Sequence, residues 1–152
     1  MPPAPSGSSP APGLVQVVAD PNVLVSAALT PGGVCADLLS RLLESPLELV
    51  ASPLLLAEVE WVLRRPRFDR LPPVLRASYV EFLRRITRSE ADPASTGGPL
   101  VAVDPRDDYL VRLTLAGDRR LLVSGDRHLL ELAGEYPIVA PRELLDRLAR
   151  PT

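Results

Sequence analysis

Acidic residues at the ends of short apolar segments are the residues of this sequence best suited to chemistry. Asp20 directly follows the apolar run 14–19, and Asp126 follows the run 120–124. Short apolar runs rich in β-branched residues predict parallel strands that are buried on both faces. Ligands of an open parallel sheet bind beyond the carboxyl ends of its strands, so Asp20 and Asp126 are expected to face one crevice. Taken singly, each acid is also a common turn former or helix N-cap.

Glu58 is a carboxylate with apolar neighbours. On the helix predicted at 53–65, the residues three and four positions away are Leu54, Leu55, Trp61 and Val62. A charge in an apolar stripe costs free energy unless something pairs with it. Glu58 therefore either faces a partner in the interior or lies at the margin of the stripe and reaches outward. Glu60, in contrast, can pair with Arg64 on a solvated face.

Three acids lie at the start of the helix predicted at 105–116, where carboxylates complement the helix dipole. Asp104 is most simply the N-cap, and Asp108 can pair with Arg112 one turn later. Asp107 lies in line with the inward-facing residues Leu110, Val111 and Thr114. Asp107 is therefore the first functional candidate of the three, and Asp108 is the second.

Gathered at one edge of a sheet, the four acids Asp20, Glu58, Asp107 and Asp126 would repel one another. The chain contains no Lys to neutralise them. A hard divalent cation such as Mg²⁺ or Mn²⁺ is the partner that all-oxygen ligands favour. Such an ion activates water and stabilises charge on a phosphoryl oxygen. Asn22 could orient that water or bind a substrate oxygen, or it could simply be a turn residue.

The composition excludes several other kinds of protein. Of the 152 residues, 46% are hydrophobic and 24% are charged, which suits one globular domain. A net charge of −2 and a pI near 5.4 argue against a protein that coats nucleic acid. The single Cys and single His exclude a disulfide framework and a Cys/His zinc site. The chain has no G-x-S-x-G motif, so His128 is expected to be a surface or cap residue, not part of a hydrolase triad.

Predicted strands and helices alternate along the chain. The strands are predicted at 14–19, 47–51, 100–103, 120–124 and 137–140. Helices are predicted at 34–44, at 53–65, from Pro72 or Pro73 to about Ser89, at 105–116, from Asp126 to about Ala133, and from Pro141 to about Ala149. This order predicts the α/β class, with three α/β/α layers around a central parallel sheet of about five strands. The Pro-rich residues 1–13 are expected to be a disordered leader, and 14–150 a single domain.

Basic and aromatic residues follow the acidic helix residue Glu58. Arg64, Arg65 and Arg67 are expected to contact a phosphate backbone beside the acids, although such a charge run can also be a solvated helix face. Trp61 is expected to be a core or interface residue and not a base-stacking platform. No apolar run reaches the roughly 18 residues of a membrane span, so no membrane association is expected.

Five motifs in order along the chain resemble those of the PIN-domain nucleases. The segment 20–27 resembles the opening D-x-N-V-L-V-S-A, and Leu56-x-Glu58 resembles the second motif. Asp104–Leu110, Leu122–Leu130 and Val139–Leu145 resemble the third, fourth and last motifs. In addition to these five motifs, the segment 61–68 resembles the V-L-x-R-P-(K/R)-F stretch of one subgroup. The resemblance extends over about 16–147 and implies a PIN-like fold.

The subgroup with these motifs is regarded as the toxin components of toxin–antitoxin systems, similar to VapC. The resemblance implies a cytoplasmic endoribonuclease that depends on Mg²⁺ or Mn²⁺. It also implies a homodimer and a cognate antitoxin protein as partners, with RNA as the substrate. Carried over by position, the catalytic and metal-binding residues would be Asp20, Glu58, Asp107 and Asp126, with Asn22 and Asp108 close to the substrate.

Two residues depart from the family pattern. Pro21 stands where Thr or Ser is usual, which removes a hydroxyl group and a backbone donor near the metal. His128 stands where a second acid often follows Asp126. These departures keep open an alternative, in which the chain is a catalytically weak or inactive PIN-like module that binds RNA or a protein.

Overall fold

The computed structural model describes residues 15–66, 71–94, 101–102 and 104–149, so the expected leader lies outside the described residues. Within these ranges the strands are β1 (Gln16–Ala19), β2 (Glu48–Ala51), β3 (Arg88–Ser89), β4 (Arg120–Val123) and β5 (Ile138–Val139). The helices are α1 (Pro21–Leu29), α2 (Val34–Glu44), α3 (Pro53–Leu63), α4 (Pro73–Ile86), α5 (Pro105–Leu115), α6 (Arg127–Leu130) and α7 (Pro141–Ala149).

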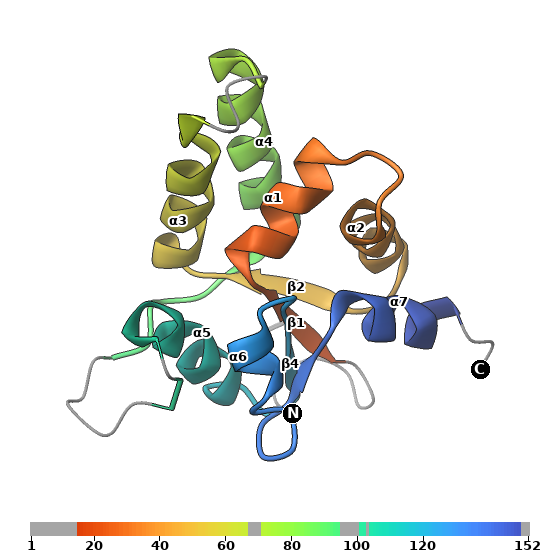
Figure 1. Cartoon of the computed structure of the whole chain (residues 1–152), viewed down its shortest axis with the longest axis vertical. Coiled ribbons are helices and arrows are strands. Elements are labelled where there is room, and N and C mark those ends of the chain that lie inside the picture. The colour runs from red at the N-terminus through yellow and green to blue at the C-terminus, as the bar shows by residue number, and fades with distance from the viewer. Residues whose placement is uncertain (1–14, 67–70, 95–100, 103, 150–152) are drawn as a thin grey trace, which may run out of the picture.

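The five strands form one parallel sheet in the order β3-β2-β1-β4-β5. Gln16 of β1 is in register with Glu48 of β2 on one side and with Arg120 of β4 on the other. The chain therefore runs outward from β1 to β3 and then returns to the far side of β1 as β4 (Figure 1). Such a reversal is the topological switch point at which open α/β sheets bind ligands.

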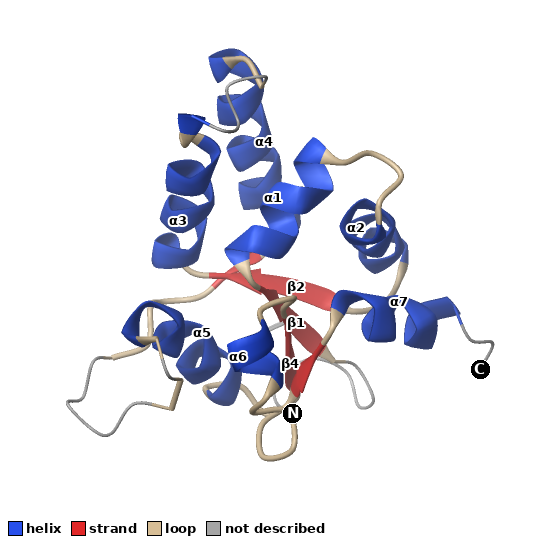
Figure 2. Ribbon diagram, in the orientation of Figure 1, coloured by secondary structure: helices blue, strands red, loops and turns tan. Residues whose placement is uncertain are grey.

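Helices cover both faces of the sheet, which confirms the predicted three-layer α/β/α fold. The helices α1 to α4 lie on one side, and α5 and α6 lie on the other (Figure 2). The last helix, α7, packs against α2. Val17 and Val18 of β1 point to opposite faces and are both fully buried. This two-sided burial explains why β1 is a nearly continuous apolar run.

The helices α1, α3 and α5 begin in the same way. Asp20, Ser52 and Asp104 are each followed by a Pro at the first helical position, where a backbone N–H would have no helical partner. The side chain of each accepts a hydrogen bond from a backbone N–H in the first turn. The prediction that Asp104 is an N-cap is confirmed, and Asp20 has that role as well.

The fifth strand is not where the sequence predicts it. Residues 101–102, within the strand predicted at 100–103, form a bend. Their backbone N–H groups donate to the carboxylate of Asp108, so they are not available to a neighbouring strand. Instead, α4 ends at Ile86, short of the predicted end, and the chain becomes extended at Thr87. Arg88–Ser89 then pair with β2.

The remaining differences concern the ends of helices. No element was predicted for 21–29, which form α1, and α3 ends two residues before the predicted Arg65. No single helix in the described part of the chain has the length and apolar character needed to cross a membrane. The helices α1 and α2 reach that length only together, and the chain bends by 103° between them.

Candidate active site

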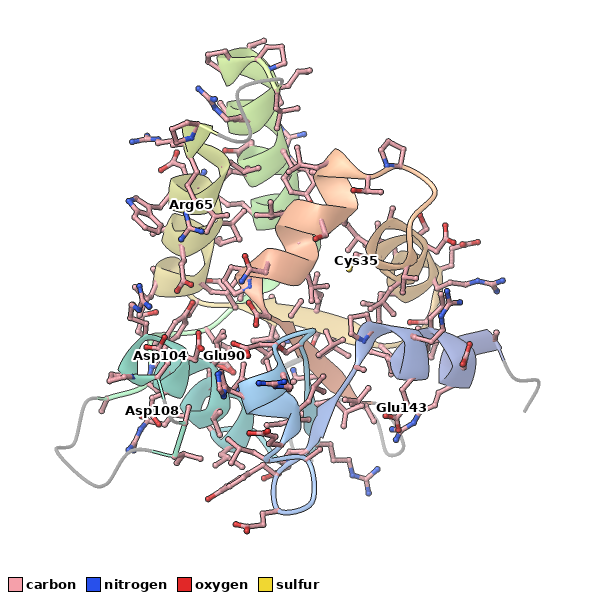
Figure 3. All side chains as sticks on the ribbon, viewed as in Figure 1. Cys35, Arg65, Glu90, Asp104, Asp108 and Glu143 are labelled. Carbon is pink, nitrogen blue, oxygen red and sulfur yellow. The ribbon has the colours of Figure 1, made fainter. Side chains whose placement is uncertain are left out.

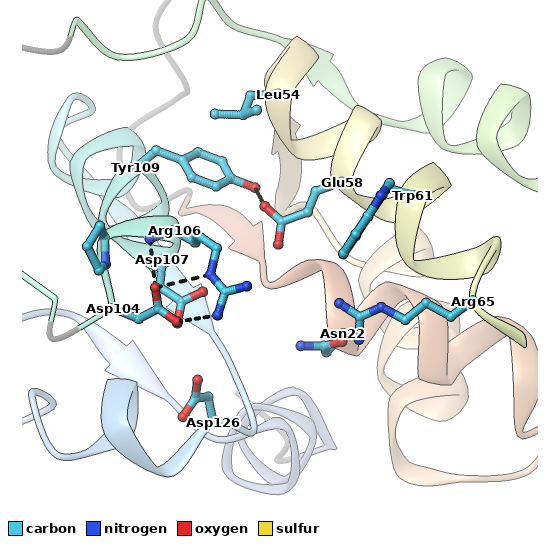
Figure 4. Close-up of a pocket in the computed structure, with 11 residues that line it drawn as sticks. Asn22, Leu54, Glu58, Trp61, Arg65, Asp104, Arg106, Asp107, Tyr109 and Asp126 are labelled. Atoms are coloured by element: carbon cyan, nitrogen blue, oxygen red, sulfur yellow. Dashed lines mark hydrogen bonds and ion pairs between the residues drawn. The ribbon is translucent and has the colours of Figure 1, made fainter. Parts of the chain in front are cut away.

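Acidic side chains from separate elements surround a pocket of about 490 Å³ at the carboxyl edge of the sheet. Glu58 from α3, Asp107 from the first turn of α5, and Asp126, which caps α6, all line this pocket (Figure 4). Asn22, at the start of α1, lines it too. Asp20 lies two residues earlier and is only 3% exposed.

The pKa values show that these carboxylates interact. Burial, together with the charges of Asp20, Asp104, Asp126 and Glu58, raises the pKa of Asp107 to about 6. Burial also raises the pKa of Asp20, and the charge of Asp126 adds to that effect. Burial raises the pKa of Glu58 as well, with a contribution from the charge of Asp20. The structure therefore brings together the four acids that the sequence singled out.

Ser124 links the two acids at the switch point. Its hydroxyl donates to Oδ2 of Asp20 at 2.8 Å and accepts from the backbone N–H of Asp126 at 3.0 Å. Ser124 is fully buried directly after β4, so both contacts are shielded from water. Sequence reasoning did not single out Ser124, although a polar residue at the end of a buried strand is a usable signal.

Tyr109 connects the two walls of the pocket. Its hydroxyl on α5 donates to Oε1 of Glu58 on α3 at 2.8 Å (Figure 4). Burial raises the pKa of the Tyr109 phenol, as does the nearby charge of Glu58, so the phenol stays protonated and remains a donor. Glu58 thus faces a partner across the pocket, as one of the two sequence interpretations proposed. Tyr109 itself was not predicted as a pocket residue.

Arg106 brings a positive charge into the acidic pocket. Its guanidinium donates to both carboxylate oxygens of Asp104, at 3.3 Å from Nε and 3.1 Å from Nη2. This hydrogen bonding lowers the pKa of Asp104. Both side chains are exposed to solvent, so the pair positions the guanidinium more than it stabilises the fold. Arg106 was not predicted as a pocket residue, because only the carboxylates of this helix were considered as candidates.

Asp108 does not lie where a substrate-binding residue is expected. It is 5% exposed and does not line the pocket. Its Oδ1 accepts from the N–H groups of Val101 and Ala102 at 2.6 and 3.0 Å, and its Oδ2 pairs with Arg112. Figure 3 shows the position of Asp108 on α5. Burial raises the pKa of Asp108, but these hydrogen bonds outweigh it and leave the pKa lowered. The local pairing with Arg112 is confirmed, and the carboxylate is used to hold the preceding loop.

The predicted phosphate-contacting arginines have different positions. Arg65 lines the pocket, and its guanidinium carbon lies 4.6 Å from the centre of the Trp61 ring. Arg64 is exposed outside the pocket, 3.6 Å from Glu60. This is the ion pair that the sequence predicts. Arg67 lies outside the described residues. Trp61 was expected to be a core or interface residue; it is 58% exposed, so it does not belong to the core.

The two departures from the family pattern lie next to the acids. Pro21 is buried at the start of α1, directly after Asp20. His128 is exposed, and its backbone N–H donates to Oδ1 of Asp126 at 2.8 Å. This agrees with the expectation of a surface or cap histidine.

The oxygen donors of the pocket fit a hard divalent cation. Asp20, Glu58, Asp107 and Asp126 offer carboxylates, the ligand type that suits Mg²⁺ and Mn²⁺. A cation would also offset the repulsion that raises the pKa of Asp107. The carboxylates do not form a ready-made cluster. Among the described residues, no group of three or more His, Cys, Asp or Glu side chains is arranged to hold a metal ion. Asp20 and Glu58 instead accept hydrogen bonds from protein hydroxyl groups.

The raised pKa of Asp107 makes stability depend on pH. The pKa of Asp107 is about 6 in the folded protein, whereas its ordinary value is 3.8. Protonation of Asp107 therefore stabilises the folded state fully below pH 3.8, and this stabilisation is lost as pH rises through 6. We expect Asp107→Asn to melt roughly 2–4 °C above the wild type at about pH 7.5, which corresponds to about 1 kcal/mol after allowance for solvent screening. At about pH 4 the two melting temperatures should coincide. A difference that is independent of pH would contradict the assignment.

Comparison with a family model agrees with this arrangement. A model described as the PIN domain matches residues 16–128, a range that contains all four acids and most of the sheet. No curated protein sequence matches the chain.

Two solved structures are similar to the fold. One is VapBC2 from Rickettsia felis, in a crystal structure with a DNA fragment from its promoter. It matches with a TM-score of 0.57 and 11% identity, over 83% of this chain and 97% of that one. PAE2754 from Pyrobaculum aerophilum matches with a TM-score of 0.60 and 21% identity, over 89% of this chain and 90% of that one. At these identities the likeness concerns the fold. Because the family model covers well over half of the chain, this protein belongs to the PIN-domain family of nucleases.

Proposed function

We propose that this protein is a metal-dependent endoribonuclease that hydrolyses RNA phosphodiester bonds through an all-carboxylate site. The observation that carries the proposal is the convergence of Glu58, Asp107 and Asp126 from separate elements on one pocket at the switch point, where burial and then mutual repulsion raise the pKa values of Asp20, Glu58 and Asp107. Such a cluster costs free energy in the folded protein, and functional sites are where such costs are retained. Membership of a nuclease family supports this interpretation.

In this proposal Asp20, Glu58, Asp107 and Asp126 would hold Mg²⁺ or Mn²⁺. When bound, the ion would supply activation of water and stabilisation of phosphoryl charge. The protein contributes position, because Ser124 holds the Asp20 carboxylate and links it to the backbone of Asp126.

Substrate contacts come from the other residues of the pocket. Asn22 is placed to bind a substrate oxygen or to orient water, since it lines the pocket directly beside the acids. Arg65 and Arg106 place guanidinium groups in the lining, where each could bind a phosphate oxygen. Arg64 is directed to the exposed side of α3, so it is assigned no part at the scissile bond.

We also propose that the protein is the toxin of a toxin–antitoxin pair, with a cognate antitoxin and a second copy of itself as partners. The VapBC2 structure, which has the same fold, supports this proposal together with the motif resemblance. Exposed apolar residues on α4, namely Val74, Leu75 and Phe82, provide surface for a protein partner. Because the proposed substrate is RNA, the proposed location is the cytoplasm.

A second function remains a candidate, that of a PIN-like module that binds RNA or protein without cleaving it. Two observations favour it. Pro21 provides neither a hydroxyl nor a backbone N–H next to Asp20, and the described carboxylates are not arranged as a ready-made metal cluster.

The test is a cleavage assay of the purified full chain with single-stranded RNA, in chelator, in Mg²⁺ and in Mn²⁺. We expect cleavage with either ion and none with chelator, because without a cation the carboxylates would repel the negatively charged phosphate. Absence of cleavage in both ions, together with a melting temperature that Mn²⁺ does not change, would select the binding module instead.

A further inference from the structure

An exposed aromatic side chain lies in the wall of the acidic pocket. Trp61 is the only tryptophan of the chain, and 58% of its surface is exposed. It lines the same pocket as Glu58, Asp107 and Asp126. An indole ring left open in a polar pocket loses the stabilisation that burial would give it. Its exposure therefore points to a ligand that covers the ring.

The position of Trp61 relative to the acids follows from helix geometry. Leu54, Glu58, Trp61 and Arg65 all line the pocket and follow one another at intervals of four, three and four residues. This spacing places them along one face of α3 and its end. Trp61 lies about 4.5 Å beyond Glu58 along the helix axis, one turn toward the end of α3. A phosphate beside Glu58 would thus have its neighbouring nucleoside within reach of the indole.

Arg65 provides the second contact that a nucleotide needs. Its guanidinium carbon lies 4.6 Å from the centre of the Trp61 ring, so the two side chains form a cation–π pair in the pocket wall (Figure 4). An arginine beside an aromatic ring can stack on a base and can bind a phosphate oxygen.

A nucleotide fits this wall better than a protein surface does. The pocket of about 490 Å³ is within the range of sites that enclose small organic ligands. The pocket that Trp61 lines also contains the charged side chains Glu58 and Arg65, and an apolar protein side chain packed there would desolvate them without offering them a new partner. A nucleotide offers both an aromatic face for the indole and a phosphate for the arginines.

We propose that Trp61, with Arg65 beside it, is a stacking platform for one unpaired nucleobase adjacent to the scissile phosphate. This inference rests on the proposed nuclease function. A base within a duplex is stacked on both faces, so only an unpaired base can occupy such a platform. The proposal departs from the sequence-based expectation that Trp61 is not a base-stacking platform.

The intrinsic fluorescence of the protein tests the proposal directly, because Trp61 is its only tryptophan. The Asp107→Asn protein is titrated with an unstructured oligoribonucleotide, and separately with an abasic oligomer of the same length. Asp107→Asn removes one negative charge that would repel RNA, and this variant is expected not to cleave the RNA. We expect the base-containing RNA to quench the emission and to bind about tenfold more tightly than the abasic oligomer, which should leave the emission unchanged.

Substitutions in the same background, measured by the anisotropy of labelled RNA, complete the test. Trp61→Ala should lose about tenfold in affinity for the base-containing RNA and nothing for the abasic oligomer, and Trp61→Phe should recover most of the loss. Leu115→Ala, which removes an exposed large apolar side chain outside the pocket, should leave both affinities unchanged.

Equal quenching by the two oligomers, or equal affinity of Trp61→Ala and its parent, would overturn the platform. A blue shift of the emission with protein concentration alone would also overturn it, since Trp61 would then be covered by a second copy. Cleavage by the wild type is scored separately. Cleavage without base-dependent quenching refutes only the platform, and quenching without cleavage refutes only the nuclease.

Discussion

Replacing Asp107 by Asn is expected to reduce the rate of metal-dependent RNA cleavage about a thousandfold, because a metal ligand in such a site contributes several kcal/mol to the transition state. The charges of all three other acids of the site contribute to the raised pKa of Asp107, so Asp107 interacts with each of them. The substitution keeps the shape of the side chain and removes only its charge. A gel assay of RNA cleavage at saturating Mn²⁺ measures the effect, and the raised melting temperature described above shows that the variant is folded.

Asp108→Asn is the matched control, since it makes the same chemical change one residue along the chain. Asp108 is occupied by Arg112 and by the backbone of residues 101–102, outside the pocket. We expect near wild-type cleavage below the melting temperature and a loss of about 2 kcal/mol of stability. The two variants should therefore differ in both activity and the sign of the stability change. Full cleavage by Asp107→Asn would remove the proposed mechanism, and the same holds for Asp20→Asn.

Replacing Arg120 by Met is expected to cause the largest loss of stability, about 3 kcal/mol in the free energy of unfolding. The Arg120 side chain is 5% exposed at the start of β4. It donates to the side chain of Gln16 on β1 and to the carbonyl of Leu113 on α5, both at 2.8 Å, and it pairs with Glu90. Met has a similar length but no donor, so these buried acceptors would lose their partner.

Urea unfolding gives the free energy, and the melting temperature should fall by roughly 6–12 °C. Arg147→Met is the control, because Arg147 forms an exposed ion pair with Glu143 at 2.7 Å. Its change should stay below about 0.5 kcal/mol. If the two substitutions cost the same, the buried network around Arg120 does not hold the sheet together. Cleavage by folded Arg120→Met should persist at low temperature, because Arg120 lies at the start of β4 and does not line the acidic pocket.

The positions of Asp20 and Asp126 could be predicted because each follows a short buried strand, and parallel strands end at a common edge. The inward side of Asp107 could be read from the 3.6-residue period of its helix. These inferences depend on local pattern plus one rule of sheet topology, so they needed no knowledge of distant contacts. The parallel α/β architecture follows from the same reasoning.

The fifth strand could not be found in this way. The apolar run around residues 101–102 has the composition of a strand, but Asp108 accepts its N–H groups, a contact that no local pattern reveals. Arg88–Ser89 pair with β2 but are too short to show a period. Tertiary hydrogen bonding therefore overrode composition at both segments.

Three residues of the site depend on contacts between distant elements. Ser124 and Tyr109 were not predicted because their partners, Asp20 and Glu58, lie 104 and 51 residues away. Trp61 was expected in the core or in an interface because aromatic residues are usually found there. Its exposure in the pocket wall depends on the tertiary arrangement, which the sequence does not reveal.

Anomalous scattering from crystals grown with Mn²⁺ tests whether the acids at the switch point hold a divalent cation. We predict an anomalous peak between the carboxylates of Asp20, Asp107 and Asp126, with the Asp107→Asn crystal showing a weaker peak or none. A wild-type pocket open to solvent at saturating Mn²⁺, with no anomalous peak among these side chains, would show that these acids do not bind the ion.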